Sequence, residues 1–247
     1  MVSSDTLIST LIKRKQVFHN VVPFTAAKDK LLQMDFTAST HYHFAEVVND
    51  TDKFSAYIAQ LLKAGHYKYG IGGYNEHRTL YARSEVFNDD KDAVHKKDAA
   101  AEPRRLHLGV DIWGEEGTPV FVPLGGVLHS FAFNDNYGDY GPTIILQHQL
   151  DSVVFHTLYG HLSLKDLHGL KEGKFVSQGE TIGHFGPPKE NGHWPPHLHF
   201  QLIRDMRVMK GDYPGVCKLS ERTHYLHNCP DPDLILQMMG YAKTDDR

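Results

Sequence analysis

Short runs of β-branched and aromatic residues dominate the chain from Leu106 onward, and this pattern constrains the fold more than any other feature. Turn-forming Gly, Pro, Asn and Asp separate the runs, as they do between strands. Such spacing favours an antiparallel sandwich or a barrel-like sheet over a doubly wound α/β fold. The strands are expected near residues 106–112, 118–122, 125–133, 142–149, 152–160, 174–185 and 197–204.

The N-terminal region is expected to be helical. Between Asp50 and Gly65 the apolar residues recur with the period of an α-helix, with capping residues before them and a glycine after them. A short helix is also expected over residues 7–17, and a last one from Asp231 to about Gly240.

These patterns divide the chain into three parts. We predict a helical N-terminal region over residues 1–83 that ends in the segment GGYNEHR, then a polar loop over residues 84–105. Residues 106–247 form the predicted β domain with its C-terminal helix.

The charge balance excludes several kinds of partner. The 247 residues carry a formal net charge of −4, so no strong basic field exists to hold nucleic acid or an anionic membrane surface. The sequence shows no signal-peptide core and no run of transmembrane length, so we expect a cytoplasmic protein.

The two cysteines are too few for a disulfide scaffold. Cys217 and Cys229 could form a zinc knuckle with His224 and His227, but their spacing is not a standard one. Two ordinary thiols, or one facultative disulfide, is the favoured interpretation.

Histidine is unusually frequent, with 18 residues, and two of them form the motif His197-Leu-His199. On a strand, residues i and i+2 point to the same face. Either both imidazoles bind one metal ion, or one binds the ion and the other reaches a metal-bound water. A second such pair, His41-Tyr-His43, is interpreted as chance or a surface pair.

His107 and Asp111 form a further motif, separated by three residues that include Gly109. In a regular strand they would stand roughly 13 Å apart, too far to share an ion. We expect Gly109 to let the backbone bend and bring them together. Two histidines and one aspartate suit a catalytic zinc site, because the fourth position stays open for a water that the metal activates.

From His107 to about Arg204 the sequence resembles the lysostaphin-type, LytM-like zinc metallopeptidases, which are peptidoglycan endopeptidases. The resemblance rests on HLGVDIWGEEGTPVFVPLGGVL, YGPTIILQH, YGHLS, FVSQGETIGHFG and PPHLHFQL. It implies a β-rich fold with a groove over an antiparallel sheet and one zinc ion per chain. It also implies His107, Asp111 and His199 as metal ligands, with His161 and His197 as the residues that transfer protons and stabilise the oxyanion.

The chain also resembles a branch of this family that is fused to kinase-like and aminotransferase domains. That branch carries a GGY-x-E-x-R segment and the strand DYGPTIILQH, both present here. Its context implies a substrate other than mature cell wall. Trp194 replaces the smaller residue of many relatives, so the groove is expected to differ.

The favoured function is therefore a zinc-dependent metallopeptidase or amide hydrolase that acts on a peptide, a peptidoglycan-like substrate or another small amide. The alternatives are a non-catalytic metal- or peptide-binding module on the same fold, and a β-sandwich whose histidines lie on the surface. Neither nucleic acid nor membrane is expected as a partner.

The segment GGYNEHR, residues 72–78, is expected to line the substrate groove, because it concentrates many hydrogen-bonding groups. A guanidinium can clamp a carboxylate or phosphate with two hydrogen bonds. Alternatively, Glu76 and Arg78 form a salt bridge that ties the helical region to the sheet. The predicted substrate-binding residues are Tyr74, Asn75, Glu76, Arg78 and Trp194.

Overall fold

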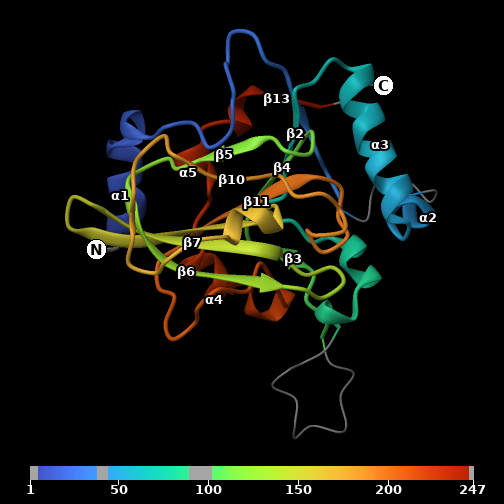
Figure 1. Ribbon diagram of the computed structural model, residues 1–247. Helices are drawn as coiled ribbons and strands as arrows, with labels where there is room; N and C mark the ends of the chain where they lie inside the picture. Colours follow the sequence, from blue (N-terminus) through green and yellow to red (C-terminus); the bar gives the residue numbers. More distant parts are fainter. Residues whose placement is uncertain (1–4, 38–43, 89–101, 245–247) are drawn as a thin grey trace, which may run out of the picture.

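The computed structural model describes residues 5–37, 44–88 and 102–244, and a large mixed sheet forms its centre (Figure 1). In the described residues this sheet has nine strands. They are β1 (Leu31–Gln33), β2 (Tyr69–Gly72), β4 (Val110–Trp113), β6 (Gly126–Asn134), β7 (Gly141–Leu150), β8 (Val153–Gly160), β9 (Phe175–Val176), β11 (His197–Ile203) and β13 (Ala242–Lys243).

The order of the strands is β13-β1-β2-β4-β11-β8-β7-β6-β9. Every neighbouring pair from β2 to β9 is antiparallel, whereas β1 runs parallel to both β2 and β13. Two small antiparallel pairs complete the strands: β5 (Pro119–Phe121) with β10 (Thr181–His184), and β3 (Leu106–His107) with β12 (Val216–Cys217). The predicted mainly β class is confirmed, and the parallel edge is an addition to it.

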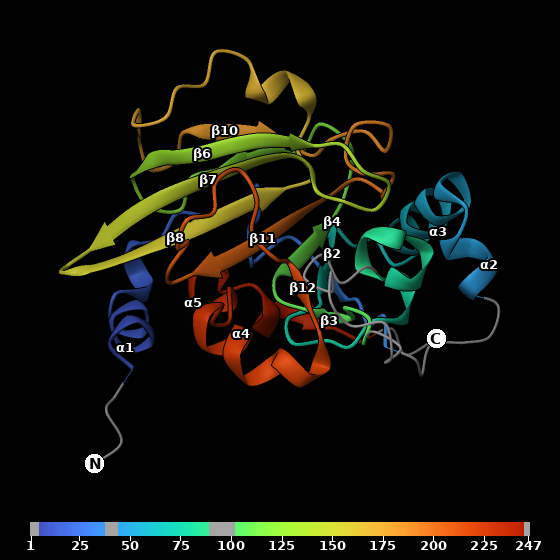
Figure 2. The same ribbon diagram turned by 90° about the horizontal axis from the view of Figure 1, so that it is seen from below.

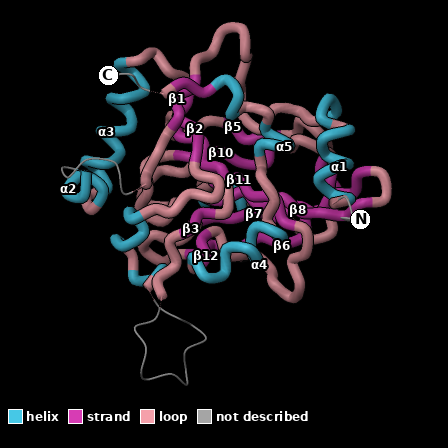
Figure 3. Tube along the Cα trace, turned by 180° about the vertical axis from the view of Figure 1, so that it is seen from behind, coloured by secondary structure: helices cyan, strands magenta, loops and turns pink. Residues whose placement is uncertain are grey.

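The helices are short and lie around the sheet (Figure 2). They are α1 (Thr6–Lys13), α2 (Phe44–Val48), α3 (Thr51–Ala64), α4 (Arg222–Asn228) and α5 (Asp233–Leu236). The 3-10 turns are Lys15–Val17, Thr79–Arg83, Glu85–Phe87, Leu164–Leu167, Leu219–Glu221 and Met239–Tyr241. Figure 3 shows α1 and α3 at opposite ends of the molecule. No helix in the described ranges is long and apolar enough to cross a membrane.

The helix predicted between Asp50 and Gly65 is confirmed as α3. The carboxylate of Asp50 accepts hydrogen bonds from two backbone amides of the first turn, which satisfies groups that a helix start leaves unpaired. The apolar face buries Phe54, Ile58 and Leu62. These side chains belong to a core cluster that also contains Trp113 of β4.

The predicted C-terminal helix is shorter than expected. α5 ends at Leu236 because Gln237 adopts the left-handed conformation, with φ 51° and ψ 36°. The carboxylate of Asp233 then accepts hydrogen bonds from the amides of Met238 and Met239, which stabilises the turn. A 3-10 turn follows instead of a longer α-helix.

The N-terminal region joins the β domain through the main sheet, because β2 pairs with β4. Residues 31–33 are a strand where the sequence favoured helix. The predicted boundaries at residues 83 and 105 stay a prediction. His41 and His43 lie outside the described residues, as do residues 89–101 of the predicted polar loop.

Candidate metal centre

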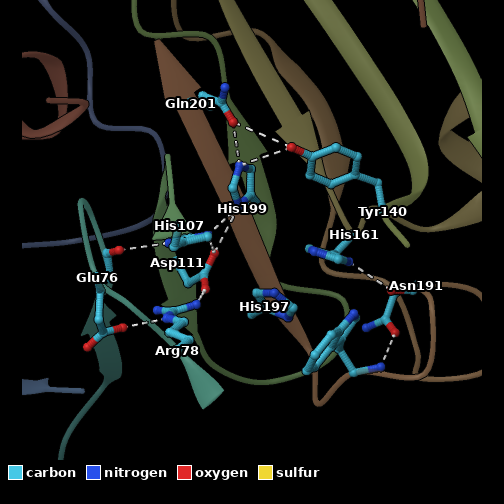
Figure 4. Close-up of polar contacts among 12 residues, drawn as sticks. Glu76, Arg78, His107, Asp111, Tyr140, His161, Asn191, His197, His199 and Gln201 are labelled. Atoms are coloured by element: carbon cyan, nitrogen blue, oxygen red, sulfur yellow. Dashed lines mark hydrogen bonds and ion pairs between the residues drawn. The ribbon is translucent and has the colours of Figure 1, made fainter. Parts of the chain in front are cut away.

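Three ligand-type side chains meet where β3, β4 and β11 come together (Figure 4). The pairing of β4 with β11 places His199 directly opposite Asp111. His107 Nε2 lies 2.9 Å from His199 Nδ1 and 3.3 Å from Asp111 Oδ1. His199 Nδ1 lies 3.1 Å from the same carboxylate oxygen. Three potential donor atoms therefore face a common point.

Gly109 lies between β3 and β4, at the position where the sequence required a bend. The predicted approach of His107 to Asp111 is confirmed, but the reason for the glycine is different. Its backbone is not left-handed, so conformational freedom does not explain it. A Cβ atom at Gly109 would lie only 2.4 Å from Cε1 of His199. The glycine is needed because the imidazole of His199 occupies that space.

The outer hydrogen bonds of both imidazoles fix their tautomers. His107 Nδ1 lies 2.9 Å from the carbonyl of Gly73, which can only accept, so Nδ1 carries the proton. His199 Nε2 lies 2.9 Å from Gln201 Oε1 and donates to it. In the neutral imidazoles, His107 Nε2 and His199 Nδ1 are then the unprotonated nitrogens, and their lone pairs face each other and Asp111.

This donor set fits a zinc ion. Ligands about 2.0 Å from a tetrahedral metal lie roughly 3.3 Å from one another. The three separations observed here are 2.9, 3.1 and 3.3 Å. Two imidazole lone pairs and a carboxylate oxygen face one another with no hydrogen-bond donor between them. A cation placed among these three atoms would attract all of them.

Gln201 is a site residue that the sequence analysis missed. Its carbonyl holds His199, while its amide nitrogen donates to the carbonyl of Pro214 at 3.1 Å and contacts Cys229 Sγ at 3.3 Å. The amide is therefore fixed in one orientation. The signal was available in the sequence, because Gln201 follows His197 and His199 at the spacing of two that places side chains on one face of a strand.

A second pair of histidines lies beside the metal-ligand group. The rings of His161 and His197 are 4.1 Å apart. His161 Nδ1 donates to the carbonyl of Asn191, and His197 Nδ1 donates to the carbonyl of Pro195; both hydrogen bonds are 2.8 Å long. Both rings thus keep Nε2 as the acceptor nitrogen.

The backbone and an aromatic ring position this second pair. His161 follows the end of β8 with φ 61°, a conformation that is rare for a residue with a side chain and is common at functional sites. The ring of His197 stacks on that of Trp113 with 3.9 Å between centroids. Neither imidazole is free to rotate without losing a contact.

Burial keeps His107, His161 and His197 neutral at pH 7. It lowers the pKa of His197 to about 4, and burial together with the charge of Arg78 lowers that of His107 to about 3. Burial and the neighbouring His197 lower the pKa of His161 well below 6.5. Burial alone would raise the pKa of Asp111, but His107 and Arg78 outweigh it and lower that pKa well below 3.8.

The segment GGYNEHR reaches the site through Arg78. This side chain is only 1% exposed, and its Nη1 donates to Asp111 Oδ2 at 2.5 Å and to the hydroxyl of Tyr81 at 3.2 Å. Its Nε is paired with Glu76, whose other oxygen accepts from the amide of Phe36. The alternative Glu76–Arg78 salt bridge is therefore present, and it extends to Asp111. A role of this segment in substrate binding stays a prediction.

The other predicted substrate-binding residues lie in different places. The hydroxyl of Tyr74 donates to the carbonyl of Cys229, and Asn75 Oδ1 accepts from Arg222. Trp194 is buried beside His161, with 6.5 Å between the ring centroids. Trp194 and Arg78 line the cavity at this site, whereas Tyr74, Asn75 and Glu76 are not among the residues found to line it.

Both cysteines are buried free thiols. Within the described part of the chain, the group of His107, Asp111 and His199 is the one found that could hold a metal ion. The zinc knuckle of Cys217, Cys229, His224 and His227 is not found there. One of its histidines, His224, instead contacts Arg207.

The sequence around this site matches known peptidases. Residues 105–210 match the family model described as Peptidase family M23. The chain is 31% identical over 107 residues to an L-Ala--D-Glu endopeptidase of Bacillus subtilis, covering 41% of this chain and 31% of that protein. It is 32% identical over 132 residues to the DD-carboxypeptidase/endopeptidase Mpg of Neisseria meningitidis, covering 53% of this chain and 26% of the relative. The chain thus spans less than a third of the length of either.

Two solved structures are also similar. The antimicrobial peptidase lysostaphin from Staphylococcus simulans is 28% identical with a TM-score of 0.37, covering 56% of this chain and 46% of that one. A zinc containing peptidase from Vibrio cholerae is 29% identical with a TM-score of 0.34, covering 44% and 32%. The family match over residues 105–210 contains all five histidine and aspartate positions described above, so this part of the chain is similar to peptidase family M23.

Proposed function

We propose that the chain is a zinc-dependent metallopeptidase or amide hydrolase. The observation that carries this proposal is the inward direction of the lone pairs of His107 Nε2 and His199 Nδ1, both beside the carboxylate of Asp111. A metal ion is the occupant that this donor set fits. A purely structural β-sandwich gives no reason for fixing two imidazoles in these tautomers within a buried cluster.

His107, Asp111 and His199 would hold one zinc ion per chain. A carboxylate in the ligand set is typical of catalytic rather than structural zinc. Zinc bound there would act as a Lewis acid on the scissile carbonyl and would lower the pKa of water. Gln201 and Gly73 keep the two imidazoles in the tautomers that this binding requires.

His161 and His197 would perform the proton transfers. Each is neutral and keeps Nε2 as an acceptor, because a backbone carbonyl takes the proton of Nδ1. A neutral imidazole can take a proton from water, and the imidazolium that results can donate to an oxyanion or to a leaving amine. The presence of two such rings, 4.1 Å apart, argues against a module that only binds metal.

The names of the relatives suggest the class of bond. They are called L-Ala--D-Glu endopeptidase and DD-carboxypeptidase/endopeptidase, so a peptide of peptidoglycan type, or another small amide, is the proposed substrate. The net charge of −4 gives no support for a nucleic-acid partner. A cytoplasmic location stays a prediction from the sequence.

The test is metal analysis combined with turnover. Elemental analysis should find one zinc per chain, and mass spectrometry should detect cleavage of peptidoglycan fragments or small amides. His199→Ala should lose zinc and activity together, whereas His197→Ala should lose activity alone. If the wild-type protein bound one zinc per chain but turned over no faster than His197→Ala, the result would support the non-catalytic module instead.

A further inference from the structure

The metal-ligand group lies at the buried end of a cavity, and we propose that this cavity admits short, free-ended peptides or comparably small amides and excludes the interior of a polymer. This inference rests on the hydrolase function proposed above and names its substrate class. It follows from three features of the structure: the burial of the reacting groups, a barrier beside His161, and the volume of the cavity.

The reacting groups are almost inaccessible from outside. His107, Asp111, His197 and His199 are each at most 2% exposed, and His161 is 6% exposed. A polymer chain that continues in both directions from its scissile bond needs an open path on either side of these groups. The burial shows that these groups lie below the surface and are reached through the cavity.

Arg83, Trp194 and Tyr137 form a cluster next to His161, here called the barrier, in which the ring of Trp194 lies 6.5 Å from that of His161. The guanidinium of Arg83 lies over the ring of Trp194 at 4.8 Å and over that of Tyr137 at 5.1 Å. Arg83 Nη2 also donates to the hydroxyl of Tyr137 at 2.5 Å. Stacked guanidinium and aromatic planes attract each other, so these three side chains hold together as one unit.

The barrier ties together segments that are far apart in the sequence. Arg83 Nη2 donates to Thr51 Oγ1 at 3.0 Å, and Thr51 in turn donates to the carbonyl of His193. The indole of Trp194 donates to the carbonyl of Gly138 at 3.1 Å. The N-terminal region, the β6–β7 connection and the segment before β11 are therefore fastened across the site at one point.

The ring of Tyr81 packs against Trp194 from the inside, with 6.0 Å between centroids. Tyr81 and Trp194 are both buried and both line the cavity. A substrate that reaches His161 therefore meets aromatic rings beyond it. The part of the substrate on that side of the scissile bond must be short.

The lining side chains that keep partial exposure indicate where the cavity opens. Most of them belong to residues 209–225, and the others are Val86, Arg104 and Asp139. The cavity has a volume of about 390 Å³. Cavities for small ligands span roughly 300–1,000 Å³, so this one lies near the lower end and suits a ligand the size of a di- or tripeptide.

The experiment compares substrates that share one bond and differ in what surrounds it. The zinc-loaded full chain is incubated with a library of free di- and tripeptides that includes L-Ala-D-Glu. The same bonds are also offered within blocked peptides of about 20 residues, which span up to roughly 70 Å when extended, and within intact peptidoglycan sacculi. Misplacing a reacting bond by about 1 Å can cost roughly 100-fold, so we expect kcat/KM for short members to exceed that for embedded bonds by about that factor.

Two variants test the barrier itself. Arg83→Ala should raise cleavage of the embedded bonds relative to the short ones by roughly tenfold or more, with zinc content unchanged, because it removes the contact that holds Trp194 and Tyr137. Arg14→Ala is the matched control, since Arg14 forms a surface ion pair with Asp151 and does not line the cavity. It should leave the ratio as it is.

A second measurement does not depend on turnover. Isothermal titration of zinc-loaded His197→Ala should detect binding of the short peptides and much weaker binding of the blocked long ones. The inference would be overturned if kcat/KM for the embedded bonds came within tenfold of that for the short peptides. It would also be overturned if the protein cleaved sacculi but no short peptide. In both cases the proposed hydrolase function would still stand. Zinc-loaded protein that cleaves neither class would overturn both.

Discussion

The replacement of Gly109 by alanine tests the geometry of the metal centre with a single methyl group. A Cβ atom there would lie 2.4 Å from Cε1 and 2.6 Å from Nε2 of His199, and 2.9 Å from the carbonyl oxygen of Phe200. Carbon atoms normally approach to about 3.5–4.0 Å. The imidazole of His199 must therefore move by roughly 1 Å, or the backbone must shift by a similar distance.

Such a movement has two measurable effects. Overpacking a dense region costs about 1–3 kcal/mol, which corresponds to a fall in Tm of roughly 2–12 °C for a protein of this size. Metal sites tolerate errors of only about 0.2 Å in ligand distance. Because the displaced ring would lose its bond to Gln201, we expect zinc affinity to fall roughly 10- to 100-fold.

Scanning fluorimetry of the metal-free protein measures the first effect, and competition with a zinc chelator measures the second. Gly240→Ala is the control, because a Cβ atom at Gly240 would meet nothing within 4 Å and that glycine is not left-handed. The control should match the wild type in both assays. A Gly109→Ala variant with an unchanged Tm and an unchanged zinc affinity would refute the explanation that His199 occupies the space beside Gly109.

Three further predictions concern the ligands, their support and the histidines outside the site. His107→Ala, Asp111→Ala and His199→Ala should lose zinc, whereas His161→Ala and His197→Ala should retain it in elemental analysis and lose activity by about 10²- to 10⁴-fold; the reverse result for His197 and His199 would exchange their roles. Gln201→Leu should weaken zinc binding roughly 10- to 100-fold in chelator competition, while Gln201→Glu, which keeps an acceptor, should weaken it less; equal affinities in all three proteins would remove Gln201 from the site. Burial lowers the pKa of both His148 and His156 to about 4, so between pH 6.5 and 4 the unfolded chain binds protons that the folded chain does not. The free energy of unfolding should therefore decrease by about 3 kcal/mol per histidine as the pH is lowered from 6.5 to 4. Urea denaturation of the metal-free protein at several pH values measures how the free energy of unfolding changes with pH. This change should be smaller in His148→Gln than in the wild type, and an equal change in both would contradict the prediction.

Local patterns in the sequence predicted the elements whose formation depends on near neighbours. The apolar period and the capping carboxylate of Asp50 were sufficient for α3. The C-terminal helix was overestimated because its end depends on the left-handed conformation of Gln237, a residue type that does not signal it. The parallel pairing of β1 with β13 joins residues 31–32 to residues 242–243, and no local pattern encodes so distant a contact.

The same distinction applies to the site. Spacing alone marked His107 with Asp111, and His197 with His199, as candidate motifs, and the family resemblance implied that His107, Asp111 and His199 are the ligands. Antiparallel pairing of β4 with β11 then joins the two motifs. The directions of Tyr74 and Asn75 could not be predicted in this way. Their partners, Cys229 and Arg222, lie about 150 positions away along the chain and are reached only through the tertiary fold.

The segment GGYNEHR shows how a motif can be identified from sequence while its physical role needs the structure. Gly73 has φ +106°, and a Cβ atom there would lie 1.9 Å from Arg78 Nη2, so this glycine makes room for the buried guanidinium. That guanidinium is shared by the carboxylates of Glu76 and Asp111, which leaves one negative charge without a partner among these three side chains. Burying an unbalanced charge is costly, and the neutral imidazole of His107 beside Asp111 does not offset it. A divalent cation held by Asp111 would reverse the balance, so the segment that carries Arg78 and the metal-ligand group are parts of one electrostatic unit.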